Sequence, residues 1–220
     1  MSYKQFDEAE RQTLEQIMRL RRDVRGNRFI DRELDDEHVQ RIIRAGMMAP
    51  SVGYSQPWRF VIIKDAATKS AVARIFAEEN QKAAHLFEGS QQATYQQLKL
   101  EGITEAPVNL AVFYEPRNTP VLGQTSMLEA GQYSTVCAIQ NMWLMARSLN
   151  IGLGWVSILD APQVEALLGA RHHKLIAYLC IGHVDTFYDK PELETLGWEC
   201  KKHYQDVVYE ESLETSIKTD

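Results

Sequence analysis

The chain has 220 residues, of which 45 % are hydrophobic, 25 % are charged and 9 % are aromatic. This length and composition favour one globular domain and exclude collagen, low-complexity disorder and disulfide-rich miniproteins. The formal net charge of −6 argues against a general nucleic-acid binder, and no apolar run approaches the roughly 20 residues that cross a bilayer.

Helix and strand patterns alternate along the chain. Apolar residues at helical spacing predict helices over 7–20, 35–48, 68–87, 91–100, 133–150 and 162–168. Apolar runs predict strands over 58–64, 108–114, 155–159 and 175–184. The uninterrupted Val61, Ile62 and Ile63 indicate a sheet that is covered on both faces. We therefore expect an α/β or α+β domain with helices on both faces of its sheet.

The three cysteines are far apart in the sequence and form no C-x-x-C motif. Their odd number indicates free thiols in a reducing cytoplasm, and the N-terminus has no apolar segment of the kind found in signal peptides. Cys137 and Cys180 lie in apolar stretches, so we expect both to be buried. The adjacent His172 and His173 are interpreted as a solvated loop, and no metal site is expected.

Five arginines fall within ten residues near the N-terminus: Arg19, Arg21, Arg22, Arg25 and Arg28. Guanidinium groups match phosphate and carboxylate in geometry, so one interpretation is an anion clamp. The other is a solvated helix end whose cations favour the helix dipole. Asp23 lies among these arginines, and their proximity would favour its ionised form but also weaken it as a base.

Two short segments have the composition of a ligand-binding site. Residues 49–58 form a small polar loop that could hydrogen-bond an amide-rich heterocycle, or that simply connects a helix to a strand. In residues 152–158, glycines permit close approach of the backbone to a flat ligand, and Ser157 could point a hydroxyl at it. A tight turn from helix to strand is the alternative. A Rossmann turn does not fit this segment, because that turn leads from a strand to a helix and this segment leads from a helix to a strand.

The three segments occur in the order R-R-x-x-R, P-S-x-x-x-S-Q-P-W and a glycine-rich turn after a long helix. Together and in this order they resemble the FMN-dependent nitroreductase family. The resemblance spans roughly residues 14–202. Within that family, the chain resembles the aerobic 5,6-dimethylbenzimidazole synthases in four places. One is Asp23, which stands where ordinary nitroreductases usually carry serine, and the others are residues 95–103, 133–143 and 152–158.

The resemblance implies an α+β nitroreductase-like fold, with a central, mainly antiparallel sheet covered by helices. It implies one domain over 1–220, with a lid at about 84–105 and a C-terminal arm at about 203–220. It also implies an intertwined homodimer with FMN at the interface and makes Asp23 and Ser157 catalytic. The implied flavin-binding residues are Arg21, Arg22, Arg25, Ser51, Tyr54, Gln56, Lys99, Leu100, Gly154, Trp155 and Lys201.

Some of these assignments need the partner subunit or are less close matches. Ser51, Tyr54 and Gln56 would approach the flavin from the partner subunit. Lys201 is a loose match to a phosphate-binding cation near the C-terminus of relatives. Gly131 departs from the polar side chain expected there in relatives, which puts substrate contacts of that helix in doubt.

The implied reaction is the O2-dependent fragmentation of reduced FMN to 5,6-dimethylbenzimidazole, the lower ligand of cobalamin, and D-erythrose 4-phosphate. FMN is then the substrate, and NAD(P)H takes part only indirectly, through a flavin reductase. Asp23 would take a proton at the ribityl carbon attached to the ring, and Ser157 would hydrogen-bond the flavin or orient O2. The alternatives are an NAD(P)H-dependent FMN nitroreductase or flavin reductase and, in another class, a non-catalytic flavin-binding module. Asp23 and the lid sequence favour the synthase.

Overall fold

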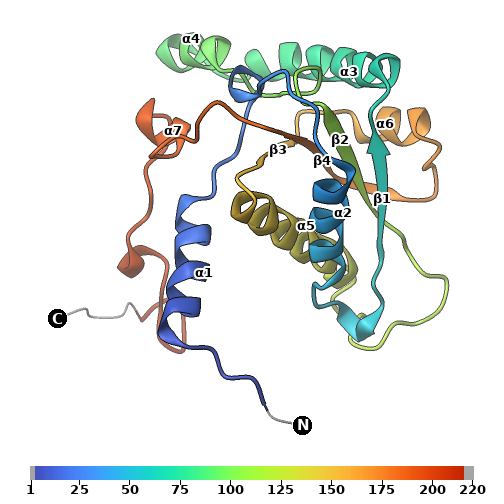
Figure 1. Cartoon of the computed structure of the whole chain (residues 1–220), viewed down its shortest axis with the longest axis vertical. Coiled ribbons are helices and arrows are strands. Elements are labelled where there is room, and N and C mark those ends of the chain that lie inside the picture. The colour runs from blue at the N-terminus through green and yellow to red at the C-terminus, as the bar shows by residue number, and fades with distance from the viewer. Residues whose placement is uncertain (1–2, 216–220) are drawn as a thin grey trace. The chain divides into compact units, whose positions relative to one another are not determined.

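The computed structural model describes residues 3–215 and contains two compact units, which part between Phe187 and Tyr188. The first unit contains α1 (Glu8–Leu20), α2 (Asp36–Met47), β1 (Trp58–Ile63), α3 (Ala66–Ala84), α4 (Gly89–Gln97), β2 (Val108–Tyr114), α5 (Ala130–Ser148), β3 (Gly152–Val156), α6 (Ala161–Leu167) and β4 (Lys174–Gly182) (Figure 1). It also has short 3₁₀ helices at Gly26–Arg28 and Val52–Tyr54. No helix within residues 3–215 combines the length and the apolar character needed to span a membrane.

The second unit is small. Its described part, residues 188–215, contains α7 (Glu192–Thr195) and a 3₁₀ helix at Tyr204–Asp206. The predicted C-terminal arm falls here, although its residues 216–220 lie outside the described residues. The assignment of the whole chain to one domain with a lid and an arm stays a prediction.

The four strands of the first unit form one sheet in the order β1-β2-β4-β3, and every neighbouring pair is antiparallel. In the register, Asn109 of β2 and Gly154 of β3 both lie opposite Cys180 of β4. This arrangement confirms the predicted α+β fold with an antiparallel sheet. The central strand β2 is buried along nearly its whole length, and the central strand β4 is buried from Ala177 to Gly182.

Helices cover both faces of the sheet, and each face has its own hydrophobic core. On one face α2 and α5 pack on the sheet, with a core that includes Val39, Ile42, Leu110, Ile139, Met142, Ala146 and Leu179. On the other face α3 and α6 contribute to a core that includes Val72, Ile75, Phe76, Phe113, Val164, Tyr178 and Cys180. The alternation of strand residues between these two cores confirms the prediction of helices on both faces. At the edge strand β1 the coverage is incomplete, because Ile62 is 47 % exposed.

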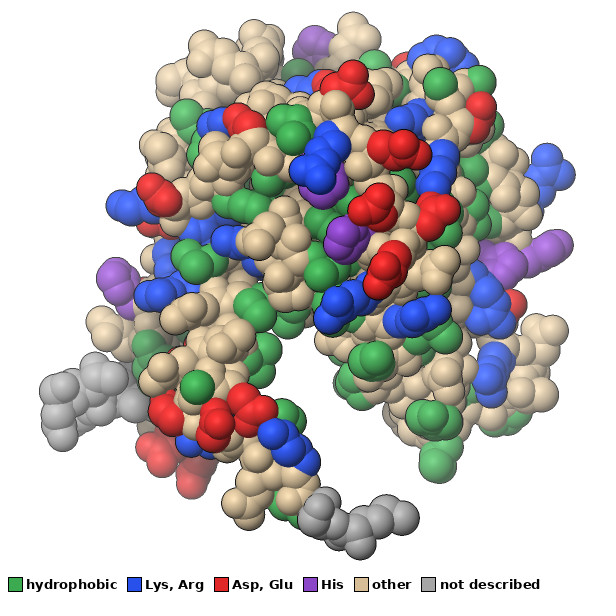
Figure 2. Space-filling model, viewed as in Figure 1, with side chains coloured by type: hydrophobic (Ala, Val, Ile, Leu, Met, Phe, Trp, Pro, Cys, Tyr) green, Lys and Arg blue, Asp and Glu red, His purple; other side chains and the backbone are tan. Residues whose placement is uncertain are grey.

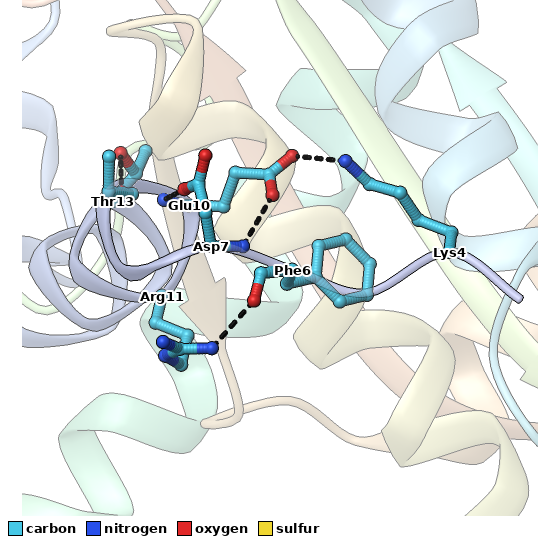
Figure 3. Close-up of polar contacts among 7 residues, drawn as sticks. Lys4, Phe6, Asp7, Glu10, Arg11 and Thr13 are labelled. Atoms are coloured by element: carbon cyan, nitrogen blue, oxygen red, sulfur yellow. Dashed lines mark hydrogen bonds and ion pairs between the residues drawn. The ribbon is translucent and has the colours of Figure 1, made fainter.

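The N-terminus of α1 is fixed by a reciprocal capping box (Figure 3). The Asp7 carboxylate accepts from the backbone N–H of Glu10 at 2.9 Å, and the Glu10 carboxylate accepts from the backbone N–H of Asp7 at the same distance. A hydrogen bond from Lys4 and that backbone bond lower the pKa of Glu10. The helix ends at Leu20, and Arg21 is already extended, with φ −63° and ψ 137°. The arginine-rich segment therefore begins where the chain leaves α1.

Two predictions need correction: the bounds of one strand and the burial of one cysteine. The strand predicted over 155–159 runs instead from Gly152 to Val156, because the turn is made by Asn150, with φ +56°, and the glycines belong to the strand. Cys180 is buried as predicted, but Cys137 is exposed, because α5 turns it away from the core. Ala138 and Ile139, which follow it in the sequence, are fully buried on another face of the helix.

Candidate active site

Asp23 and its neighbour Val24 lie alongside strand β3. Asp23 forms an isolated parallel bridge with Leu153, and the N–H of Val24 donates to the Leu153 carbonyl at 3.2 Å. A Cβ at Gly154 would lie 1.9 Å from the carbonyl oxygen of Val24. Gly154 is thus required for the close approach of this backbone carbonyl, whereas the predicted approach of a flat ligand to Gly154 stays a prediction.

Both carboxylate oxygens of Asp23 have partners. Oδ1 accepts from the backbone N–H of Trp155 at 2.9 Å, and Oδ2 forms an ion pair with Arg25. The Arg25 guanidinium also donates to the Trp155 carbonyl at 3.0 Å, so both polar backbone groups of Trp155 take part. This network fixes the orientation of the carboxyl group relative to the strand.

Burial raises the pKa of the Asp23 carboxyl above its ordinary value. Arg25, the Trp155 N–H and Arg21 act in the opposite direction, but burial outweighs them. The expectation that nearby arginines would leave Asp23 a weak base is therefore wrong, because it counted the charges and not the desolvation. A carboxylate of raised pKa is the stronger base once it is ionised.

The three arginines of the predicted clamp lie close together but differ in their partners. Arg22 donates to the carbonyls of Arg19 at 2.9 Å and Arg21 at 2.7 Å, at the C-terminal end of α1. Arg25 is paired with Asp23. The Arg21 guanidinium stacks on Trp143, with its Cζ 4.5 Å from the ring centroid, and has no protein acceptor within residues 3–215. Arg21 therefore has the donors best placed to receive an anion.

Over most of the face seen in Figure 2, charged side chains of both signs are interspersed, whereas acidic side chains gather at its lower left. Burial lowers the pKa of Arg21, and Arg22 adds to this effect while Asp23 opposes it. Partial burial of a cation strengthens its attraction to an anion, because water screens the pair less. An anion bound here would depend on a few converging donors.

Ser157 lies one residue beyond the end of β3 and is exposed. The backbone amide that binds Asp23 belongs to Trp155, two residues earlier on the same strand. The structure thus brings together Asp23, Trp155 and the end of β3 that carries Ser157. The roles of Gly154, Trp155 and Ser157 toward a flavin stay predictions.

The loop from Ser51 to Pro57 has an unusual backbone. Gly53, Tyr54 and Gln56 all have left-handed φ values, of 55°, 52° and 47°. The Ser51 hydroxyl accepts from the N–H of Gln56 at 3.1 Å and holds the loop closed. Tyr54 is 83 % exposed. Left-handed conformations are costly for residues other than glycine and are concentrated at functional sites, so this loop is a candidate for contact with a ligand or a partner.

Lys99 belongs to a small network at the base of the predicted lid. It forms ion pairs with Glu101 and, at 2.7 Å, with Glu105. Burial alone would lower the pKa of Lys99, but these two carboxylates outweigh it and raise that pKa. The Glu101 carbonyl accepts from the N–H of Gly26 at 2.8 Å, which ties this network to the arginine segment. Leu100 packs against the second core.

Sequence reasoning missed Glu101 and the contacts of Trp143. Glu101 is only 9 % exposed, and an acidic residue flanked by Leu100 and Gly102 gave a weak sign of its burial. Trp143 falls within the helix predicted over 133–150, and its position beside the arginines depends on tertiary structure. Among residues 3–215, no cluster of three or more His, Cys, Asp or Glu side chains could hold a metal ion.

Lys201 and Gly131 are two further positions that the sequence analysis named. Lys201 is exposed in the second unit, and its assignment to a phosphate stays a prediction. At Gly131, a Cβ would lie 2.5 Å from the ring of Tyr114, whose hydroxyl accepts from Gln124 at 3.1 Å. The absence of a side chain at Gly131 therefore makes room for Tyr114 against the start of α5.

Comparison with known proteins adds independent information. The model of the nitroreductase family matches residues 18–183. The chain is 42 % identical over 200 residues to a 5,6-dimethylbenzimidazole synthase of Rhodospirillum rubrum, covering 90 % of this chain and 94 % of that protein. It is 39 % identical over 197 residues to a synthase of the same name from Rhodobacter capsulatus, covering 88 % and 94 %. Its fold is similar to that of oxidised iodotyrosine deiodinase bound to FMN and 3-iodo-L-tyrosine, with a TM-score of 0.68, 22 % identity, and coverage of 80 % of this chain and 92 % of the other.

Proposed function

Because the chain belongs to the nitroreductase family, we propose that it is a 5,6-dimethylbenzimidazole synthase that uses reduced FMN as its substrate. The overall reaction converts reduced FMN and O2 to 5,6-dimethylbenzimidazole, D-erythrose 4-phosphate and a fragment of the pyrimidine ring that carries the remaining carbons and nitrogens. The benzimidazole is the lower ligand of cobalamin. The 42 % identity to a protein of that name extends over nearly the full length of both chains, which supports a shared activity.

The observation that carries this proposal is the setting of Asp23. A serine at this position could not act as a base near neutral pH, whereas a carboxylate can. Here the carboxylate is oriented by Arg25 and the N–H of Trp155, and burial raises its pKa. A general base with these properties suits a reaction in which a proton must leave carbon.

The donor set fits FMN. The Arg21 guanidinium has no protein acceptor within residues 3–215, and its flat array of N–H groups matches a phosphate. The Arg22 and Arg25 side chains lie in the same short segment. The end of β3, with Trp155 and Ser157, lies next to the Asp23 carboxyl group. In this arrangement Arg21 would hold the phosphate end of the flavin, and β3 would lie near its ring.

When bound, reduced FMN supplies electrons that O2 accepts. The chain supplies position and proton transfer. Asp23 would take a proton at the ribityl carbon attached to the ring, and Arg25 and the Trp155 N–H fix the orientation of its carboxylate. Ser157 donates a hydrogen bond to the ring or orients O2. The lid, at about 84–105, excludes water during the reaction, and Lys99 with Glu101 and Glu105 fixes its base.

A homodimer completes the site in this proposal. Large apolar side chains are exposed on α5 and at the end of α2: Met47 (55 %), Met48 (76 %), Tyr133 (55 %) and Val136 (40 %). Large exposed apolar side chains of this kind are typical of a protein–protein interface. Ser51, Tyr54 and Gln56 then reach the flavin that is bound mainly by the other subunit. Tyr54 is the exposed member of the three, and the left-handed φ values of Tyr54 and Gln56 shape the loop that carries them.

A coupled assay tests this function against the alternative, an NAD(P)H-dependent nitroreductase or flavin reductase. The protein is mixed in air with FMN, NADH and a separate flavin reductase, and total FMN is followed by chromatography. We expect FMN to disappear and 5,6-dimethylbenzimidazole to accumulate only when the protein, the reductase and O2 are all present. Steady oxidation of NADPH by the protein alone, with FMN fully recovered, would establish the reductase instead.

A further inference from the structure

Helix α5 contacts the arginine segment through one side chain at two points. The indole Nε1 of Trp143 donates to the carbonyl of Arg22 at 3.1 Å. The face of the same indole lies under the Arg21 guanidinium, with Cζ 4.5 Å from the ring centroid. Trp143 thus holds both the backbone of this segment, at Arg22, and the guanidinium of Arg21.

The geometry of this contact leaves the donors of Arg21 available. A guanidinium that stacks on an aromatic ring uses its face, and its N–H groups lie in the plane of the guanidinium and point outward. Stacking also restricts the rotamers of a long side chain. An arginine held in this way loses less conformational freedom when it binds an anion than an unrestrained arginine loses.

The surroundings hold Trp143 itself in place. Its ring lies 6.4 Å from that of Trp155, measured between centroids, at an interplanar angle of 50°. One turn later on α5, Arg147 Nε donates to the carbonyl of Leu20 at 3.0 Å. Trp143 is therefore in contact with Arg21 on one side and Trp155, whose amide binds Asp23, on the other.

We propose that Trp143 is a positioning residue that holds Arg21 in the orientation needed to bind the phosphate of FMN, an inference that rests on the proposed function. Trp143 acts through Arg21 and need not touch the flavin. It follows that Trp143 determines how strongly the protein prefers FMN to riboflavin, which has the same ring and ribityl chain but no phosphate.

Binding of oxidised flavin tests this without turnover, because the proposed reaction needs reduced flavin. Dissociation constants for FMN and riboflavin are measured by flavin fluorescence for the wild type, W143F, W143L, R21A and the double variant W143L/R21A. We expect W143L to weaken FMN binding about tenfold and to leave riboflavin binding nearly unchanged. W143F keeps an aromatic face, so it should retain most of the preference for FMN. In the R21A background, W143L should have little further effect on FMN.

A control variant separates positioning from general stability. Ile139 is fully buried one turn earlier on α5, and I139V should lower the melting temperature without changing the ratio of the two dissociation constants. The inference is overturned if W143L weakens FMN and riboflavin equally, or if it weakens FMN as strongly with R21A as without it. If R21A itself leaves the preference for FMN unchanged, the assignment of Arg21 to the phosphate fails, and the role of Trp143 fails with it.

Discussion

The chemistry of Asp23 depends on two opposing effects on one carboxyl group. Arg25 and the N–H of Trp155 stabilise its ionised form and fix its direction, while burial favours the neutral acid and raises its pKa. An exposed aspartate beside arginines would be well oriented but weakly basic. The structure combines orientation with increased basicity, which is what proton removal from carbon requires.

Replacing Asp23 by asparagine tests this role directly. In Asp23→Asn the amide oxygen can still accept from Trp155, but no base remains. We expect benzimidazole to form at least about 100-fold more slowly in a single turnover. The affinity for FMN should stay within a few-fold of that of the wild type. A variant that forms product at the wild-type rate would rule out proton transfer by Asp23.

The pH dependence provides a second test at this residue. In the proposed role Asp23 must be ionised to act as a base, so the rate should fall as the pH drops through its pKa. Because burial raises that pKa, the fall should begin above the range of an ordinary aspartate, whose pKa is about 3.9. Single-turnover rates with pre-reduced FMN, measured from about pH 4 to pH 8, give the midpoint. A midpoint at or below the ordinary value would contradict the assigned environment.

At the scale of elements, strand β3 organises the site, and Gly154 is the residue that allows it. A Cβ there would lie 1.9 Å from the Val24 carbonyl, and backbone cannot yield as a side-chain tip can. Gly154→Ala should therefore push the segment that carries Asp23 away from β3. We expect a loss of stability of about 3 kcal/mol by urea unfolding and an almost complete loss of activity in the fraction that remains folded.

Gly169 supplies the matched control. It has a left-handed φ of +70°, but no atom lies within 4 Å of the position its Cβ would take. Gly169→Ala should cost about 1 kcal/mol from backbone strain and leave the activity per folded molecule unchanged. Equal losses of activity in the two variants would show that the contact with Val24 does not matter.

The sequence predicts elements well where a single local pattern dominates. The strand over 108–114 is found with the same bounds, and α2 differs from its predicted bounds by one residue at each end, because apolar periodicity is strong in both. At β3 the local pattern gives the wrong prediction. Glycines usually mark turns, but Gly152 and Gly154 lie in the strand, where Val184 and Val24 occupy the space that their side chains would take. Tertiary packing decided that element, and it also decided the exposure of Cys137.

The same distinction applies to the site. Arginine clustering and the unusual Asp23 identified the segment that lies along β3, because residue type alone limits the chemistry there. The partners of each arginine could not be read from the sequence. Arg25 pairs with Asp23, and Arg21 stacks on a tryptophan more than a hundred positions away, so these contacts exist only in the folded chain.

At the scale of the whole molecule, the account requires two copies of the chain. Light scattering after size-exclusion chromatography should give a dimer. Val136 lies 40 % exposed on α5, and Val136→Asp would place an unpaired charge in the interface, so we expect it to weaken the dimer at least about 30-fold. Activity should fall with the dimer, because the loop with Ser51 would be missing from each site.

Leu167 is the control for that substitution. It is 43 % exposed on α6, which packs on the other face of the sheet from α5. Leu167→Asp should leave the molar mass of the dimer in solution and the enzymatic activity unchanged. A wild type that is monomeric at micromolar concentration and still active would contradict the dimeric site.

The central claim is that FMN is consumed as a substrate, and one single-turnover measurement tests it most directly. Uniformly 13C-labelled FMN is reduced anaerobically, bound to excess protein and then exposed to O2, and the products are quantified by mass spectrometry. The account predicts close to one labelled 5,6-dimethylbenzimidazole for each FMN lost, and none without O2. Quantitative recovery of intact labelled FMN, with no labelled benzimidazole, would contradict it.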